Sequence, residues 1–179
     1  MRATPNFRAG VPASVRCGGV ATGELRALLA AASVRLNRIG EELFTDQRFQ
    51  TSAASKLVNV QVVSAADFGF ADGATFSQLA DAAAARGLKL CPLELAPHMR
   101  LQFPDQAESP EDPDARTGRA PLGAITVASE PPGVEELVPW GFYLCRYGDD
   151  LWLRGYRCSS GHIWSPEDLF IFIRPGDEV

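Results

Sequence analysis

The sequence has few features that identify a chemistry, and its small set of cysteines is a first example. The four cysteines form no C-x-x-C pair, a spacing common in zinc and redox sites; they are Cys17, Cys91, Cys145 and Cys158. The chain also lacks a G-x-x-x-x-G-K-S/T segment, which excludes that phosphate-binding loop. We therefore expect reduced cysteines without a disulfide framework, no metal site and no cofactor.

Long apolar runs and long basic runs are both missing. The longest apolar patch, Leu25 to Val34, is interrupted by Arg26 and is too short to cross a bilayer. The first residues lack the apolar stretch of a signal peptide, so we expect a cytoplasmic protein that does not associate with membranes. The net charge is −5 without a cluster of basic residues, so a nucleic acid is not the expected partner.

The composition that remains is that of one globular domain. Of the 179 residues, 46% are hydrophobic and 22% are charged, which is enough for one buried core. Residues 1–21 contain prolines and glycines without an apolar period and are predicted to form a flexible arm. The domain is expected over residues 22–174, with a mobile acidic loop at 104–120 and a tail at 175–179.

Two helices are predicted. The first covers residues 22–43, where apolar side chains recur at intervals of three and four. The second begins at Thr75, whose spacing to Gln78 predicts a capping box, and it ends at Gly87. Residues 88–103 are predicted to be extended, because proline biases the preceding residue away from the helical conformation.

Alternating apolar residues predict strands in the second half of the chain. Within residues 140–157, the pair Gly148-Asp149 predicts a hairpin with a two-residue turn. One face of this hairpin then carries Phe142, Leu144, Leu151 and Leu153. Residues 169–173 are apolar on both faces, which is typical of an inner strand. The expected fold is α+β, with two helices packed on a mostly antiparallel sheet that ends in a C-terminal β-meander.

The aromatic residues are concentrated in this hairpin region. All three tryptophans and all three tyrosines lie between Trp140 and Trp164. The second hairpin face collects side chains suited to contact a ligand or partner: Tyr143, Tyr147, Trp152, Arg154 and Tyr156. We therefore favour a non-catalytic binding or accessory module of unknown ligand, with self-association or a protein partner on this aromatic face. The competing interpretation is that a helix covers the same face as core.

Two other groupings could support chemistry. Cys91, Glu94 and His98 share one short segment, and a thiol, a carboxylate and an imidazole are the parts of an activated nucleophile. A small hydrolase or transferase is therefore the alternative function, although a buried thiol is the simpler interpretation of Cys91. Cys158 and His162 could ligate zinc together with Cys91 and His98, but their spacing fits no metal motif.

Three stretches of the chain also have a recognisable sequence: Leu88 to Gln102, Gly141 to Leu144, and Leu151 to Tyr156. In these stretches the chain resembles a group of small uncharacterised bacterial proteins. The resemblance extends in outline over residues 22–174 and includes no catalytic signature. It implies a compact bacterial domain and no particular activity.

Overall fold

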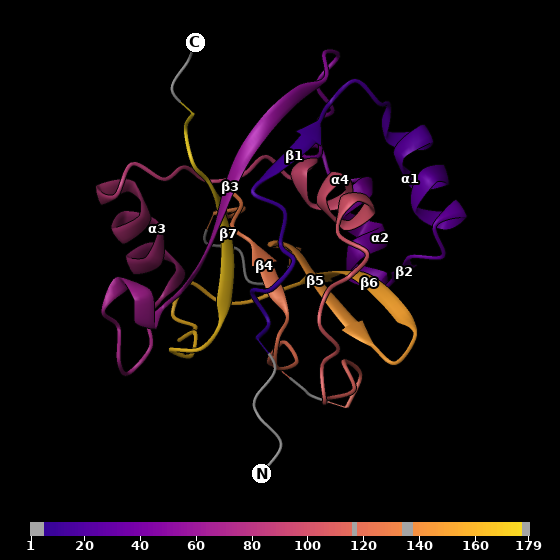
Figure 1. The fold of residues 1–179 in the computed structure, drawn as a ribbon. Helices are drawn as coiled ribbons and strands as arrows, with labels where there is room; N and C mark the ends of the chain where they lie inside the picture. The colour runs from indigo at the N-terminus through magenta and orange to yellow at the C-terminus, as the bar shows by residue number, and fades with distance from the viewer. Residues whose placement is uncertain (1–5, 116–117, 134–137, 177–179) are drawn as a thin grey trace.

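A seven-stranded sheet lies at the centre of the fold in the computed structural model, which describes residues 6–115, 118–133 and 138–176 (Figure 1). The strands are β1 (Ser14–Cys17), β2 (Arg35–Leu36), β3 (Lys56–Ser64), β4 (Ile125–Val127), β5 (Gly141–Tyr147), β6 (Asp150–Tyr156) and β7 (Leu169–Ile173). They are ordered β1-β3-β7-β4-β5-β6-β2. Most neighbours are antiparallel, but β4 runs parallel to β7 and β2 runs parallel to β6.

Helices lie on both faces of this sheet. They are α1 (Thr22–Ala31), α2 (Arg38–Phe44), the short 3-10 helix η1 (Ala66–Phe68), α3 (Phe76–Ala85) and α4 (Leu95–Gln102). Strand β7 separates two cores, because Leu169 and Ile171 pack with α1, α2 and α4, whereas Phe170 and Phe172 pack with α3 (Figure 1). No helix within the described ranges is long and apolar enough to span a membrane.

The predicted fold class is therefore wrong: four α-helices cover two faces of a curled, mixed sheet. One cause is that the helix predicted over 22–43 is two helices. Helix α1 ends at Ala31, and Ser33 then adopts a positive φ of 56° that breaks the helical path. Helix α2 restarts after Asn37, whose side-chain oxygen accepts a hydrogen bond from the Gly40 amide at 2.9 Å. Both helices face the same core, so their apolar spacing conceals the break.

The second cause is α4, which forms within the segment predicted to be extended. Pro97 is the third residue of this helix, where the backbone amides have no partner inside the helix, so proline removes no hydrogen bond there. Only the start of the segment is extended: Lys89 forms a bridge to Ile173, and Cys91 forms one to Ser129.

The predicted C-terminal β-meander is wrong, because β7 does not pair with β6. The capping box, the hairpin turn and the inner strand are confirmed. The Gln78 amide donates to Thr75 Oγ1 at 3.3 Å, and the Thr75 amide donates to Gln78 Oε1 at 2.9 Å, so the capping box starts α3. Tyr147 pairs with Asp150 across the hairpin, which leaves Gly148 and the residue after it as the two-residue turn. Strand β7 lies between β3 and β4 and is an inner strand.

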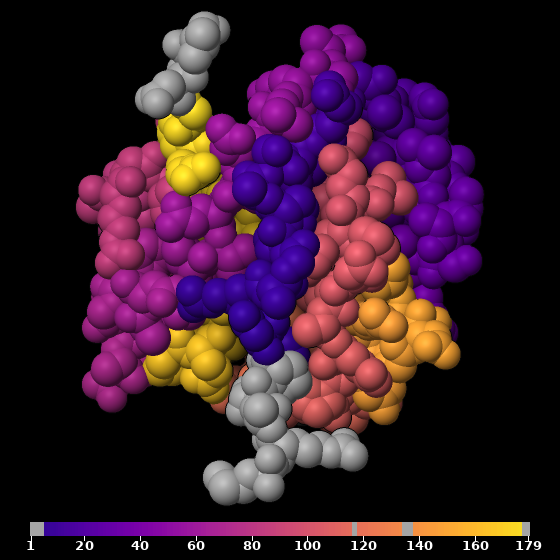
Figure 2. Space-filling view, in the orientation of Figure 1, coloured from indigo at the N-terminus to yellow at the C-terminus, as the bar shows by residue number. Residues whose placement is uncertain are grey.

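Parts of the predicted arm and loop contact the domain. Ser14–Cys17 form β1, which pairs antiparallel with β3, and Figure 2 shows this indigo chain lying along the surface beside the magenta β3 segment. In the acidic loop, the buried Gln106 accepts a hydrogen bond from Arg100 at 2.6 Å and donates one to the Leu144 carbonyl at 3.0 Å. Residues 1–5 of the arm, 116–117 of the loop and 177–179 of the tail lie outside the described residues.

Candidate functional site

A cavity of about 200 Å³ lies over the β5–β6 hairpin. Its walls come from both strands, from the residues at the start of α2, from Pro113 and residues 118–120, and from the loop that precedes β7. We call this cavity the hairpin pocket. Three of the five predicted contact residues line it: Tyr143, Arg154 and Tyr156.

The other two predicted contact residues lie elsewhere. Tyr147 is at the end of β5 and is exposed. Trp152 is only 8% exposed, because the guanidinium carbons of Arg35 and Arg154 lie 4.6 and 4.7 Å from its ring. The aromatic hairpin face is consequently a partly covered pocket and not a flat open surface.

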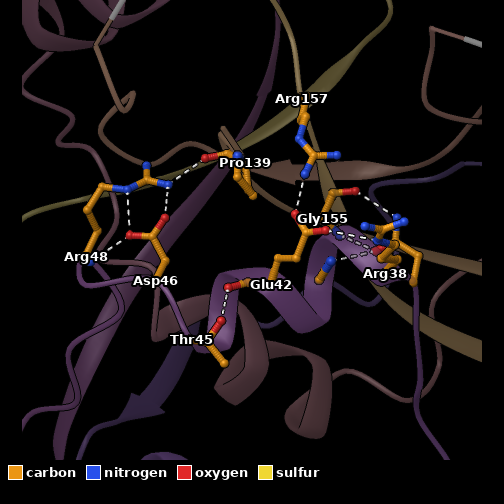
Figure 3. A network of polar contacts seen from close by, with 10 residues as sticks. Arg38, Glu42, Thr45, Asp46, Arg48, Pro139, Gly155 and Arg157 are labelled. Carbon is orange, nitrogen blue, oxygen red and sulfur yellow. Dashed lines mark hydrogen bonds and ion pairs between the residues drawn. The ribbon is translucent and has the colours of Figure 1, made fainter. Parts of the chain in front are cut away.

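The close approach of α2 to β6 forms one wall of the hairpin pocket. Asn37 Nδ2 donates to the Gly155 carbonyl at 2.9 Å, and the Gly155 amide donates to Asn37 Oδ1 at 2.8 Å. A Cβ atom at Gly155 would lie 2.6 Å from the Gly40 amide nitrogen, so only glycine permits this contact. Figure 3 shows the same junction from α2, where Glu42 pairs with Arg38 and Arg157.

Arg154 is the buried charge of the hairpin pocket. Its side chain is 9% exposed, and Nη2 donates to Asp114 Oδ1 at 2.6 Å. Its Nε and Nη1 atoms are buried and have no partner with hydrogen-bond geometry among the residues described, although the Tyr143 hydroxyl interacts with the same guanidinium. Leaving buried donors unpaired typically costs about 1–3 kcal/mol each, so a bound acceptor would be strongly favoured here. Although burial lowers it, the nearby Tyr143 and Asp114 raise the pKa of Arg154, which stays charged.

The remaining lining residues add positive charge and hydrogen-bond donors. Arg119 and Arg157 join Arg154 among the lining residues, although Asp114 pairs with Arg154 and Glu42 pairs with Arg157. Burial raises the pKa of Tyr143 to about 12, so its hydroxyl remains protonated and can donate. The buried indole nitrogen of Trp164 also lacks a partner in the described part of the chain. The pocket is therefore suited to an anionic ligand, although the chain as a whole is acidic.

His162 makes folding stability depend on pH in a predictable direction. Burial lowers its pKa from the ordinary 6.5, against the opposing charge of Asp168. As the pH falls below about 6.5, the unfolded chain takes up a proton here before the folded chain does, so the free energy of unfolding decreases. In urea unfolding from pH 7.5 to 5.5, we expect His162→Gln to lose less stability than the wild type. A difference that is constant with pH would contradict this.

The structure divides the predicted Cys91, Glu94 and His98 cluster. Cys91 Sγ donates to the Ile171 carbonyl at 3.4 Å, and burial raises the pKa of this thiol. Cys17 takes its place, with its sulfur within 4.8 Å of ligand atoms of Glu94 and His98. Burial, followed by the charge of Glu94, raises the pKa of Cys17 to about 12, so this thiol is not an activated nucleophile.

The four residues considered as zinc ligands are also divided. Cys158 and His162 line the hairpin pocket, whereas Cys91 and His98 do not. Cys17 was not predicted to belong to this cluster, because it lies far from α4 in the sequence and inside the predicted arm. The only available signal was chemical, since Cys17 is one of four cysteines in the chain.

Comparisons of the chain with models of protein families, with curated proteins and with solved structures found no match. The functional inference therefore depends on the geometry and chemistry of the site itself.

Proposed function

We propose that the protein is a binding module that takes a small oxyanion-bearing molecule, a carboxylate or a phosphate, into the hairpin pocket. The observation that carries this proposal is the buried Arg154 guanidinium, whose Nε and Nη1 atoms are unpaired within the described ranges. Each parallel pair of N–H donors on the planar guanidinium includes Nη2, which already donates to Asp114, so an oxyanion beside Asp114 would accept from Nη1 or from Nε. A bound oxyanion would satisfy one of the two unpaired donors and balance part of the positive charge of the lining.

The aromatic walls favour a ligand that also carries a flat ring. Tyr156 and Trp164 meet edge to face with ring centroids 5.6 Å apart, and His162 meets Trp164 in the same way at 5.0 Å. Such walls bury apolar ligand surface while the polar groups fix its orientation. The cavity of about 200 Å³ lies below the roughly 300–1,000 Å³ of drug-sized ligand sites, which favours a small molecule over a peptide.

This proposal narrows the sequence-based hypothesis of a binding or accessory module. Trp152 is buried and Pro113 covers part of the hairpin face, so little flat aromatic surface is left for self-association. A cytoplasmic location remains part of the proposal. It is supported by the four free cysteines, three of them buried, which suit a reducing compartment.

The proposal predicts that Arg154→Gln weakens oxyanion binding by about 10-fold or more, because a charged hydrogen bond contributes about 1.5–3 kcal/mol. Binding would be measured by calorimetry with four probes: acetate, inorganic phosphate, benzoate and phenyl phosphate. The two probes with a ring should bind more tightly than the two without. Arg35→Gln is the matched control, since Arg35 also stacks on Trp152 and pairs with Asp150 but does not line the pocket.

A second variant separates ligand binding from a purely structural role for Arg154. Asp114 is 67% exposed and pairs with Arg154 from the loop, so it competes with an oxyanion for the same guanidinium. Asp114→Asn should therefore tighten benzoate binding, whereas it should weaken binding if Arg154 serves only to anchor the loop. The proposed function would be refuted if the wild type bound none of the four probes. It would also be refuted if the wild type and Arg154→Gln bound the probes with equal affinity.

A further inference from the structure

We propose that Cys17, Glu94 and His98 form a binding site for a zinc ion, separate from the hairpin pocket and independent of the function proposed for it. Each residue offers one ligand atom, namely a thiol sulfur, a carboxylate oxygen and an imidazole nitrogen, and these atoms lie within 4.8 Å of one another. All three residues are buried, with exposures of 0%, 2% and 5%. This donor set suits zinc, which is bound in proteins by these three kinds of ligand.

Two elements bring the three ligands together. Glu94 and His98 are four residues apart at the start of α4, and this spacing places them on one face of the helix. Cys17 is the last residue of β1. A reciprocal pair of hydrogen bonds joins β1 to α4, because the Arg16 amide donates to Gln102 Oε1 at 2.9 Å and Gln102 Nε2 donates to the Arg16 carbonyl at 2.8 Å. The spacing of the ligands is therefore fixed by the fold.

A third segment encloses the cluster. Ser52 donates two hydrogen bonds to the Glu94 carboxylate, from its amide at 3.0 Å and from its hydroxyl at 2.5 Å. The Gly19 amide donates to the Ser52 carbonyl at 2.7 Å. Gly18 has a φ of +86°, and a Cβ atom there would lie 2.4 Å from the Ala54 carbonyl oxygen, so glycine is required for this close contact. Metal ligands held in this way are oriented before an ion arrives.

Charge balance also favours a divalent cation. Glu94 is a buried carboxylate, and no ion pair to it is present in the ranges that the structure describes. Burying a charge without an opposite charge is costly. On binding, the Cys17 S–H bond breaks, an S–Zn bond forms and the proton passes to solvent. One thiolate, one carboxylate and one neutral imidazole then balance the two positive charges of zinc.

The geometry requires only a small contraction. With metal–ligand bonds of about 2.0–2.3 Å, neighbouring ligand atoms in a tetrahedral zinc site lie about 3.5 Å apart. His98 Nε2 accepts a hydrogen bond from the Gly18 amide at 3.2 Å, which metal coordination through this atom would replace. A water molecule can supply the fourth ligand. Because the site is enclosed, we assign it a structural role in tying β1 to α4.

The test uses the full chain after treatment with a chelator, and cobalt(II) serves as the spectroscopic probe for zinc. We expect one cobalt ion per chain, with a thiolate-to-cobalt charge-transfer absorption that zinc displaces. Zinc should also raise the midpoint of thermal unfolding of the metal-free protein. Cys17→Ser should lose the charge-transfer absorption. Cys91→Ser is the matched control, since it removes a second buried cysteine that is not a proposed ligand, and it should retain the absorption.

X-ray absorption of the zinc-loaded wild type gives a readout that does not depend on whether any variant folds. We expect one sulfur and otherwise nitrogen or oxygen neighbours around the zinc. The assignment would be overturned if zinc did not bind one-to-one or if the zinc shell contained no sulfur. It would also be overturned if the charge-transfer absorption survived in Cys17→Ser but disappeared in Cys91→Ser. Cys158 and His162 of the hairpin pocket could also bind the probe metal, and the Cys17→Ser variant distinguishes the two sites. The oxyanion proposal is tested by other ligands, so failure here leaves that test unaffected.

Discussion

Leu153→Ala is expected to lower the free energy of unfolding by about 2–5 kcal/mol, measured by urea or thermal unfolding. Leu153 has no exposed surface and lies opposite Leu144 in the pairing of β5 with β6. Both leucines belong to the core that α1, α2 and α4 cover, together with Phe142. Truncation would leave a cavity at the centre of this core, where the neighbouring side chains are held by both the sheet and the helices.

Leu57→Ala provides the matched control. Leu57 is the same residue type on strand β3, but it is 61% exposed, so its truncation should change the stability by no more than about 0.5 kcal/mol. A loss below about 1 kcal/mol for Leu153→Ala would contradict the assignment of Leu153 to the core. Trp152 on the opposite face of the hairpin is also buried. Both hairpin faces are therefore covered, and neither is an open surface.

The parts of the fold that local sequence rules determine could be predicted. The Thr75 and Gln78 capping box depends on residues three positions apart, and the structure shows both of its hydrogen bonds. The register of the β5–β6 hairpin follows from its two-residue turn and from the alternation of side chains, which agree with each other. In each case the decisive contacts lie within one short segment.

The parts that depend on distant contacts could not be predicted. The break between α1 and α2 exists because β2 pairs with β6, and this pairing joins Arg35 to a residue far along the chain, Trp152. The prolines before and within α4 are compatible with either an extended segment or the first turn of a helix. Packing of α4 against β1 selects the helix, and that contact has no local sequence signal.

The same distinction applies to the two candidate sites. Tyr143, Arg154 and Tyr156 could be predicted as neighbours because strand alternation places them on one hairpin face. The loop residue Pro113 and the residue before α2, Asn37, complete the pocket through tertiary contacts that alternation does not describe. In the proposed zinc site, the helical spacing joins only two of the ligands, and strand β1 supplies the third from near the start of the sequence.

Gly155→Ala should be destabilising by about 1–3 kcal/mol in urea unfolding, the usual cost of forcing extra atoms into a packed contact. The added Cβ would lie 2.6 Å from both the Gly40 nitrogen and the Ile39 carbonyl carbon. These are backbone atoms, so no side-chain rotation can relieve the contact. Helix α2 would have to move away from β6, which would also lengthen the hydrogen bonds that join Asn37 to Gly155.

Gly141→Ala is the control for this prediction, because Gly141 occupies the neighbouring strand of the same hairpin. Its added Cβ would meet the Tyr156 ring at 3.5 Å, an ordinary van der Waals distance, so its effect should be much smaller. Equal stabilities of the two variants would contradict the close approach of α2 to β6. Since Asn37 and Gly155 both line the hairpin pocket, a displaced α2 would also change the pocket. We therefore expect Gly155→Ala, under conditions where it remains folded, to weaken benzoate binding more than Gly141→Ala does.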